Sequence, residues 1–287
     1  MPALLATLLL VLVLVLGTGC AGDEPDQRPT VVAAFYPLAW AAEQIGGDSI
    51  DVVNLTPPGA EPHDVELTPR DVEKIQNADL VLYLGSGFQP ALEHAVEGRS
   101  GPALDLLDGQ KLMTGADAEQ GAYDPHVWLD PSRFAAMVTL IGAQLHLEPA
   151  AARLVAKLEA LDSELADGLA HCRRHEIVTS HAAFGYLAKR YGLKQLALTG
   201  LSPEAEPSPR DLEALVDEVK RTDATTVFFE TLVSSKLADT VAREAGAKTA
   251  VLDPLEGLTE DEVAAGEDYF SVMRGNLAIL RAALQCR

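Results

Sequence analysis

Histidines held in proline-containing segments are the residues of this chain best suited to chemistry. His126 lies between two Asp-Pro steps in DPHVWLDP, and His63 lies in EPHDVELTP. His181 ends the apolar segment EIVTSH, and Asp253 follows another apolar segment in AVLDPLEGL. Imidazole nitrogens and carboxylate oxygens at about 2.0–2.2 Å are ligands of four-coordinate Zn²⁺. These residues predict a metal site, provided that the fold brings them together.

The remaining histidines lack such a setting. His94 lies in a short helical segment beside a glutamate, and His146 ends a predicted helix. His171 and His175 flank the basic residues of HCRRH. We expect His171 and His175 to face water, and we expect none of the four to belong to a site.

Strands and helices alternate along the chain from Thr30 onward. Apolar, β-rich segments in the first half are TVVAAFYPL, IDVVNLT and DLVLYLGS, and those in the second half are EIVTSH, LKQLALTGL, TTVFFET and KTAVLDP. Amphipathic segments between them predict helices, and one long helix from Thr259 to Gln285 is predicted to end the chain. This alternation predicts an α/β fold with parallel sheets covered by helices.

A leucine-striped helix lies between the two halves. Its leucines recur at steps of three and four, which places them on one face: Leu154, Leu158, Leu161, Leu165 and Leu169. We therefore predict an N-terminal domain at 30–147, a linking helix at 148–174 and a C-terminal domain at 175–287. Sites in α/β sheets form outside the carboxyl ends of strands, which is where His181 and Asp253 lie. His63 lies in a loop that leaves such an end.

The N-terminus predicts export. Ala3–Leu16 is apolar but shorter than the ~20 residues of a membrane-spanning helix, so residues 1–19 are predicted to be a signal peptide, and the alternative is an uncleaved membrane anchor. GTGC resembles the lipidation motif of bacterial lipoproteins, with Cys20 as the lipidated residue. The polar residues 20–29 are predicted to be a flexible tether. We expect the protein on the outer face of the cytoplasmic membrane, or in the periplasm if it is not lipidated.

Charge and cysteine content narrow the function further. The formal net charge of −21 argues against nucleic acid as a partner, because phosphates would be repelled. Cys172 and Cys286 remain once Cys20 is assigned to the lipid. In an exported protein they predict a disulfide, and the alternative is two buried thiols.

Several motifs together resemble a known family. EPHDVELTP, DPHVWLDP, TSHAAFGYLAKRYGL, FFETLVSSKLADTVAREAG and VLDPLEGLT are similar to segments of the cluster A-I solute-binding proteins of bacterial ABC importers, and most closely to the zinc-binding branch. The resemblance implies two Rossmann-like domains joined by one long rigid helix, with the metal site in the cleft between them. Matching the motifs residue by residue places His63, His126, His181 and Asp253 at the ligand positions.

Further acidic residues lie in the same motifs. Asp64, Asp124 and Asp130 are candidate acceptors for imidazole N–H groups, which would fix the ring tautomer. Glu61 and Glu230 lie in matching motifs as well, and metal ligation, a hydrogen-bonding role around the site and a surface position are all open for them. Glu256 is the alternative to Asp253 as the fourth ligand, because LDPLEG offers two nearby carboxylates.

The resemblance implies a transport protein and not an enzyme. We expect the chain to capture Zn²⁺ outside the cell, as a monomer, and to deliver it to an ABC permease and its ATPase. Four protein ligands and no HExxH motif argue against a zinc hydrolase. The alternatives are a manganese-type protein of the same family and a metal-dependent adhesin lipoprotein. The manganese branch has a carboxylate at the His181 position, so His181 favours zinc.

Overall fold

Two parallel four-stranded sheets organise the chain in the computed structural model, which describes residues 28–114, 123–203 and 208–287. The strand order is β2-β1-β3-β4 in the N-terminal sheet and β6-β5-β7-β8 in the C-terminal sheet, so both follow the same scheme. The strands are β1 Thr30–Ala33, β2 Asp51–Asn54, β3 Leu80–Tyr83, β4 Ala103–Asp105, β5 Glu176–Thr179, β6 Lys194–Ala197, β7 Thr226–Phe229 and β8 Lys248–Val251. The predicted α/β class is confirmed.

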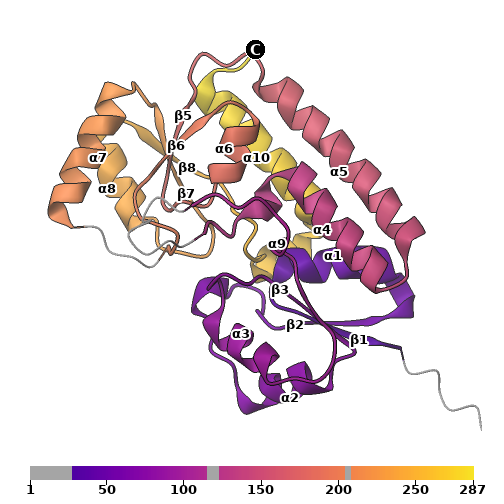
Figure 1. Cartoon of the computed structure of the whole chain (residues 1–287). Helices are drawn as coiled ribbons and strands as arrows, with labels where there is room; N and C mark the ends of the chain where they lie inside the picture. The colour runs from indigo at the N-terminus through magenta and orange to yellow at the C-terminus, as the bar shows by residue number, and fades with distance from the viewer. Residues whose placement is uncertain (1–27, 115–122, 204–207) are drawn as a thin grey trace, which may run out of the picture.

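The N-terminal lobe carries α1 Tyr36–Gly46, α2 Pro69–Asn77 and α3 Pro90–Glu97 around its sheet (Figure 1). Helix α2 begins where the sequence predicts, because Thr68 and Asp71 form a capping box and Pro69 occupies the first turn. Strand β4 was not among the predicted strands, since its three residues carry too little pattern to be detected.

Two central helices connect the lobes. Helix α4 spans Pro131–Gln144 and packs against α5, Glu148–Leu169, which runs along one side of the molecule toward the chain end (Figure 1). The predicted leucine stripe of α5 is buried along its whole length. Helix α5 therefore joins the lobes through an apolar face.

The C-terminal lobe carries α6 Gly185–Arg190, α7 Pro209–Arg221 and α8 Lys236–Ala245. The prediction of one helix from Thr259 to Gln285 is wrong, because the segment forms α9 Glu260–Ala265 and α10 Tyr269–Leu284. Gly266 ends α9 in the left-handed conformation, with φ 76°, and the Asp268 side chain caps the start of α10.

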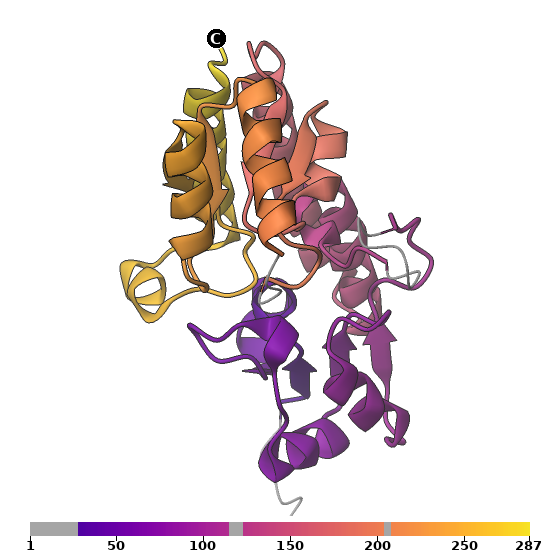
Figure 2. The same cartoon turned by 90° about the vertical axis from the view of Figure 1, so that its left-hand side faces the viewer.

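The hydrophobic core extends through both lobes. One large cluster includes Val32 of the first sheet, Leu158 of α5 and Ile177 of the second sheet. A smaller cluster lies beneath α7 and α8 and includes Val178, the next residue of β5. Successive strand residues point to opposite faces, so β5 contributes to both clusters. Figure 2 shows the two lobes one above the other.

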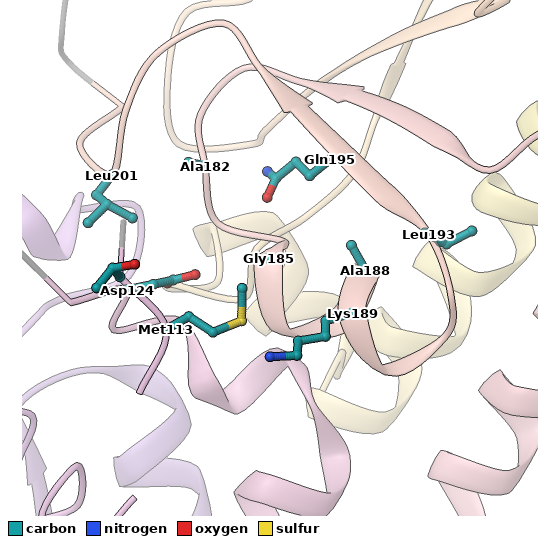
Figure 3. A pocket seen from close by; sticks show the side chains of 10 residues that line it. Met113, Asp124, Ala182, Gly185, Ala188, Lys189, Leu193, Gln195 and Leu201 are labelled. Atoms are coloured by element: carbon teal, nitrogen blue, oxygen red, sulfur yellow. The ribbon is translucent and has the colours of Figure 1, made fainter. Parts of the chain in front are cut away.

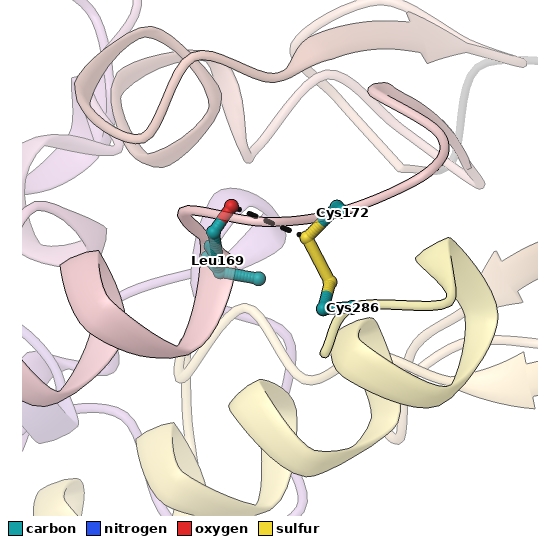
Figure 4. Close-up of a disulfide and its surroundings, with 3 residues drawn as sticks. All are labelled: Leu169, Cys172 and Cys286. Atoms are coloured by element: carbon teal, nitrogen blue, oxygen red, sulfur yellow. Dashed lines mark hydrogen bonds between the residues drawn. A yellow bond between two sulfur atoms is a disulfide. The ribbon is translucent and has the colours of Figure 1, made fainter.

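A disulfide joins Cys172 to Cys286, as predicted (Figure 4). It links the segment that follows α5 to the residue pair that ends the chain. Backbone bonds support the junction, because the N–H groups of Arg173 and Arg174 both donate to the Leu284 carbonyl.

Buried hydrogen bonds also cross between the lobes. Trp128 Nε1 donates to the Pro254 carbonyl at 2.8 Å, and the Tyr269 hydroxyl donates to the Trp128 carbonyl at 2.7 Å. The Tyr186 hydroxyl donates to the Asp124 carbonyl at 2.9 Å and accepts from the Met113 N–H at 2.8 Å. Trp128 is thus a core residue with a satisfied indole N–H.

The predicted signal peptide at 1–19, the lipidation site Cys20 and most of the predicted tether at 20–29 lie outside the described residues. Among the residues that the structure does describe, none of the helices has the length and apolar character needed to span a bilayer.

Candidate metal centre

Three imidazoles and one carboxylate meet between the lobes. The Nε2 atoms of His63, His126 and His181 lie 3.3, 3.0 and 3.2 Å from Glu256 Oε1. The Nε2 atoms of His126 and His181 lie 3.4 Å apart. Three ring nitrogens therefore surround one carboxylate oxygen in a site that is almost closed to solvent.

These separations match the edges of a zinc coordination tetrahedron. With metal–ligand bonds of about 2.0–2.1 Å, neighbouring ligand atoms of a tetrahedral ion lie about 3.3 Å apart. The three nitrogen–oxygen separations and the His126–His181 separation, four of the six edges, are 3.0–3.4 Å. The ligand types and their spacing thus suit a four-coordinate zinc ion held without an open position.

The strand order explains why these residues meet. His63 lies in the short helix Pro62–Asp64 after β2, and His126 precedes the short helix Val127–Leu129 after β4. His181 follows β5, and Glu256 follows β8. Two groups thus come from the carboxyl ends of each sheet, the usual location of sites in α/β folds.

Carboxylates behind two of the rings fix their orientation. His126 Nδ1 lies 2.8 Å from Asp124 Oδ1, which also accepts from the His126 backbone N–H at 2.9 Å. His181 Nδ1 lies 2.8 Å from Glu230 Oε1, which also accepts from the Ser180 hydroxyl at 2.6 Å. Each Nδ1 donates to its carboxylate, so Nε2 faces the centre of the site.

Gly185 leaves space for the Asp124 carboxylate. A Cβ atom at position 185 would lie only 2.8 Å from Asp124 Oδ2, so the first residue of α6 packs directly against this carboxylate. A pocket of about 430 Å³ opens beside it, with Met113, Lys189 and Gln195 in its lining (Figure 3). Asp124 therefore lies between this pocket and the His126 ring.

Asp253, expected as the fourth ligand, is not part of the cluster; Glu256 is. Asp253 Oδ1 instead accepts the backbone N–H of Leu255 at 2.7 Å. Leu255 adopts a left-handed conformation, with φ 55°, in the turn that leads to Glu256. The alternative that the sequence left open is thus the one that the geometry favours.

The other candidate residues divide by position. Asp124 and Glu230 contact ligand imidazoles, as described above, whereas Asp64 is exposed. Asp130 was expected to accept an imidazole N–H, but it caps α4 through the N–H groups of Ser132 and Arg133. Glu61 accepts the backbone N–H of His63 at 3.0 Å and so shapes the loop that carries this ligand.

The histidines outside the motifs stay away from the site. All of them are exposed residues: His94, His146, His171 and His175.

Without a metal, the site behaves as a buried ion pair. Burial opposes charging of His181, but the Glu256 and Glu230 carboxylates outweigh it and raise its pKa to about 10. His126 follows the same pattern, and its pKa is raised by Asp124 and Glu256 against the effect of burial. Burial favours the neutral form of Glu256, yet the three imidazoles lower its pKa well below the ordinary value.

The pKa values of His63, Asp253 and Glu61 are governed mainly by burial. Burial lowers the pKa of His63, and the hydrogen bond and charge of Glu256 offset this effect only in part. Burial raises the pKa of Asp253 to about 7. Burial and the Glu256 charge raise the pKa of Glu61 to about 9.

Two α/β lobes that share a buried cluster of side chains able to hold a metal ion are the arrangement expected of a solute-binding protein for metals. The chain belongs to the ZnuA family, described as "Zinc-uptake complex component A periplasmic", whose pattern matches residues 31–283.

Relatives with names and structures support this assignment. The zinc-binding lipoprotein AdcA of Streptococcus pneumoniae is 38% identical over 281 residues, covering 90% of this chain and 56% of AdcA. The chain thus spans about half the length of AdcA. The high-affinity zinc uptake system protein ZnuA of Bacillus subtilis is 37% identical over 287 residues, covering 92% of this chain and 90% of that protein.

Solved structures agree with the fold. The Zn(II)-bound ZnuA-like domain of S. pneumoniae AdcA has a TM-score of 0.77 at 38% identity, covering 90% of this chain and 99% of that domain. The laminin-binding protein Lmb of Streptococcus agalactiae, titled a bifunctional protein with adhesin and metal transporting activity, has a TM-score of 0.80 at 31% identity, covering 90% of this chain and 100% of Lmb.

Proposed function

We propose that this protein captures Zn²⁺ outside the cytoplasm and delivers it to an ABC permease with its ATPase. The observation that carries the proposal is the set of four ligand atoms at tetrahedral spacing between the lobes. Membership of the ZnuA family and likeness to proteins named for zinc binding and zinc uptake support it.

We propose His63, His126, His181 and Glu256 as the zinc ligands. Three imidazole nitrogens and one oxygen favour Zn²⁺ over Mn²⁺, because harder ions prefer more oxygen ligands. Asp124 and Glu230 would hold the ring orientations as positioning residues. Zinc is the transported ligand in this proposal, and the four protein ligands leave no coordination position for a catalytic water.

The cellular setting is part of the same proposal. A signal peptide at 1–19, lipidation at Cys20 and a tether at 20–29 would hold a monomer on the outer face of the cytoplasmic membrane. The lobes would extend over 30–147 and 175–287, with 148–174 as the linking segment. The relative named a lipoprotein supports this arrangement.

The first test compares two neighbouring carboxylates. Elemental analysis of the purified wild type should find about one zinc ion per chain, the stoichiometry of one four-coordinate site. Glu256→Gln should lower zinc affinity by about 100-fold, which corresponds to losing roughly one quarter of a typical binding free energy of ~10–16 kcal/mol.

Asp253→Asn is the matched control, because asparagine keeps an oxygen that can accept the Leu255 N–H. It should leave zinc affinity unchanged in a competition titration against a chelator. Loss of affinity in Asp253→Asn alone would return the fourth ligand to Asp253. Retention of affinity in both variants would remove this cluster as the zinc site.

A further inference from the structure

A second group of carboxylates adjoins the histidine cluster. Glu61, Glu230 and Glu256 each place one carboxylate oxygen within 4.8 Å of those of the other two. They come from the loop after β2, the end of β7 and the loop after β8, so both lobes contribute. Glu256 belongs to this group and to the histidine cluster.

Each of these carboxylates has one oxygen in use and one that is not. The Oε1 atoms of Glu61, Glu230 and Glu256 accept from His63 N–H, from Ser180 and His181, and from the three imidazoles, respectively. The Oε2 atoms of all three are buried and have no hydrogen-bond partner among the described residues. Glu230 is only 2% exposed and Glu256 0%.

Buried carboxylate oxygens without partners are costly, so this arrangement calls for a cation. Glu256 can bridge, because its Oε1 faces the imidazoles and its other oxygen stays unused. Bridged pairs of metal ions about 3.5–4 Å apart are well known in two-metal sites.

The dimensions suit a hard divalent cation. Calcium binds oxygen ligands at about 2.3–2.6 Å, so its ligands lie at most about 4.6–5.2 Å apart. One oxygen of each of the three carboxylates lies within 4.8 Å of those of the other two, which is close enough for a single ion of this kind to contact all three. Calcium also tolerates irregular geometry and water ligands, which the partly exposed Glu61 side can supply.

We propose that Glu61, Glu230 and Glu256 form a second cation site, selective for a hard divalent ion such as Ca²⁺, which is occupied when zinc fills the adjoining histidine cluster. The proposal rests on the zinc site proposed above, because Glu256 is shared. It assigns Glu61 a function in ion binding that is separate from zinc ligation.

The test is equilibrium dialysis of the protein, loaded with one equivalent of zinc, against ⁴⁵Ca²⁺, with zinc measured by elemental analysis in the same samples. The wild type should bind about one calcium ion with a dissociation constant of ~10⁻⁴–10⁻³ M, the range of extracellular calcium modules. Glu61→Gln keeps an oxygen that can accept the His63 backbone N–H, so the variant can be loaded with zinc and compared at equal zinc content. It should weaken calcium binding at least about tenfold.

Glu66→Gln is the matched control, because Glu66 is an exposed glutamate of the same loop. It should bind calcium and zinc like the wild type. Glu61→Asp keeps the charge and should bind calcium more tightly than Glu61→Gln, which separates charge from folding.

Several results would overturn the second site. They are no calcium bound by the zinc-loaded wild type, equal calcium binding by Glu61→Gln and Glu66→Gln, and displacement of zinc by calcium. A wild type that retains no zinc would instead contradict the proposed function, and zinc analysis before dialysis detects that outcome separately.

Discussion

His126 and His181 differ from His63 in how the protein holds them. The side chains of the first two are 0% and 1% exposed, and a carboxylate lies 2.8 Å behind each Nδ1. The His63 side chain is 10% exposed, and it packs edge-on against the Phe88 ring. Its loop is positioned by a backbone bond to Glu61 and not by a bond to its own Nδ1.

This difference shows that the protein fixes the ring orientations of His126 and His181 more firmly than that of His63. Buried carboxylates set the tautomer of His126 and His181 and raise their pKa values, whereas burial alone lowers the pKa of His63. The two anchored rings are therefore expected to contribute most of the zinc affinity. The third ring completes the tetrahedron from the more exposed side.

The largest expected effect comes from removing one of the two histidines, His126 and His181, that have a carboxylate behind Nδ1. His181→Ala should lower zinc affinity by ~100-fold or more, since one ligand contributes roughly a quarter of the ~10–16 kcal/mol typical of such sites. The loss also leaves Ser180 as the remaining hydrogen-bond donor to Glu230 Oε1. His63→Ala should lower zinc affinity by a smaller factor, because water can reach the vacated position. Competition titration against a chelator measures the zinc affinity of both variants. Equal losses would contradict the expectation that His181 contributes more to zinc affinity than His63.

Neutralising the carboxylates behind the rings should have the next largest effect. Asp124→Asn and Glu230→Gln should each weaken zinc binding by ~10–100-fold, the usual size of such changes. Asp64→Asn is the control, because Asp64 is exposed beside the less anchored His63. The same titration applies, and a loss in the control as large as in Asp124→Asn would argue for a general charge effect.

The pH dependence of zinc affinity should reflect the raised pKa of His181. The pKa of His181 is raised from 6.5 to about 10, so its proton stabilises the metal-free fold below pH 6.5, and this stabilisation is lost as the pH rises toward 10. Zinc must displace that proton, so zinc affinity should rise with pH between 6 and 8.5, by about one log unit per pH unit per proton.

Calorimetry in buffers of different ionisation enthalpy counts the protons that zinc releases. Wild type at pH 7 should release about one or two, from His181 and His126, whereas His181→Ala should release fewer. Affinity that stays flat across this range, after correction for the chelator, would contradict the proton competition.

The smallest expected effect on zinc comes from the disulfide, which lies far from both kinds of histidine. Replacing Cys172 and Cys286 by serine should lower the free energy of unfolding by ~2–5 kcal/mol, because the bridge closes a long loop. Zinc affinity should change by less than about twofold, since no ligand or positioning residue touches the bridge. Chemical denaturation and the chelator titration check the two halves of this prediction.

Much of the fold and site could be predicted from sequence because the signals are local. The strand segments, the capped start of α2 and the leucine stripe of α5 are all patterns within a few residues. The three histidines that meet in the structure were each identified from a short local motif, and His181 alone was placed at the end of a predicted strand.

The fourth position depended on a feature that sequence does not reveal. Leucine seldom adopts a left-handed conformation, so nothing in LDPLEG indicated that Leu255 would turn the chain there. That turn uses the Asp253 carboxylate to accept a backbone N–H and directs Glu256 to the histidines. Asp130 was misassigned for a similar reason, because Asp before Pro-Ser-Arg also suits a helix cap.

The hydrogen bonds of Trp128, Tyr186 and Tyr269 have a mechanical consequence. Each bond is buried and joins a residue that precedes α5 to a residue that follows it. Swinging the lobes apart as rigid bodies would break all of them at once and expose the aromatic rings to water. Binding and release of an ion should therefore require shifts of individual loops, while the two lobes keep nearly the same relative position.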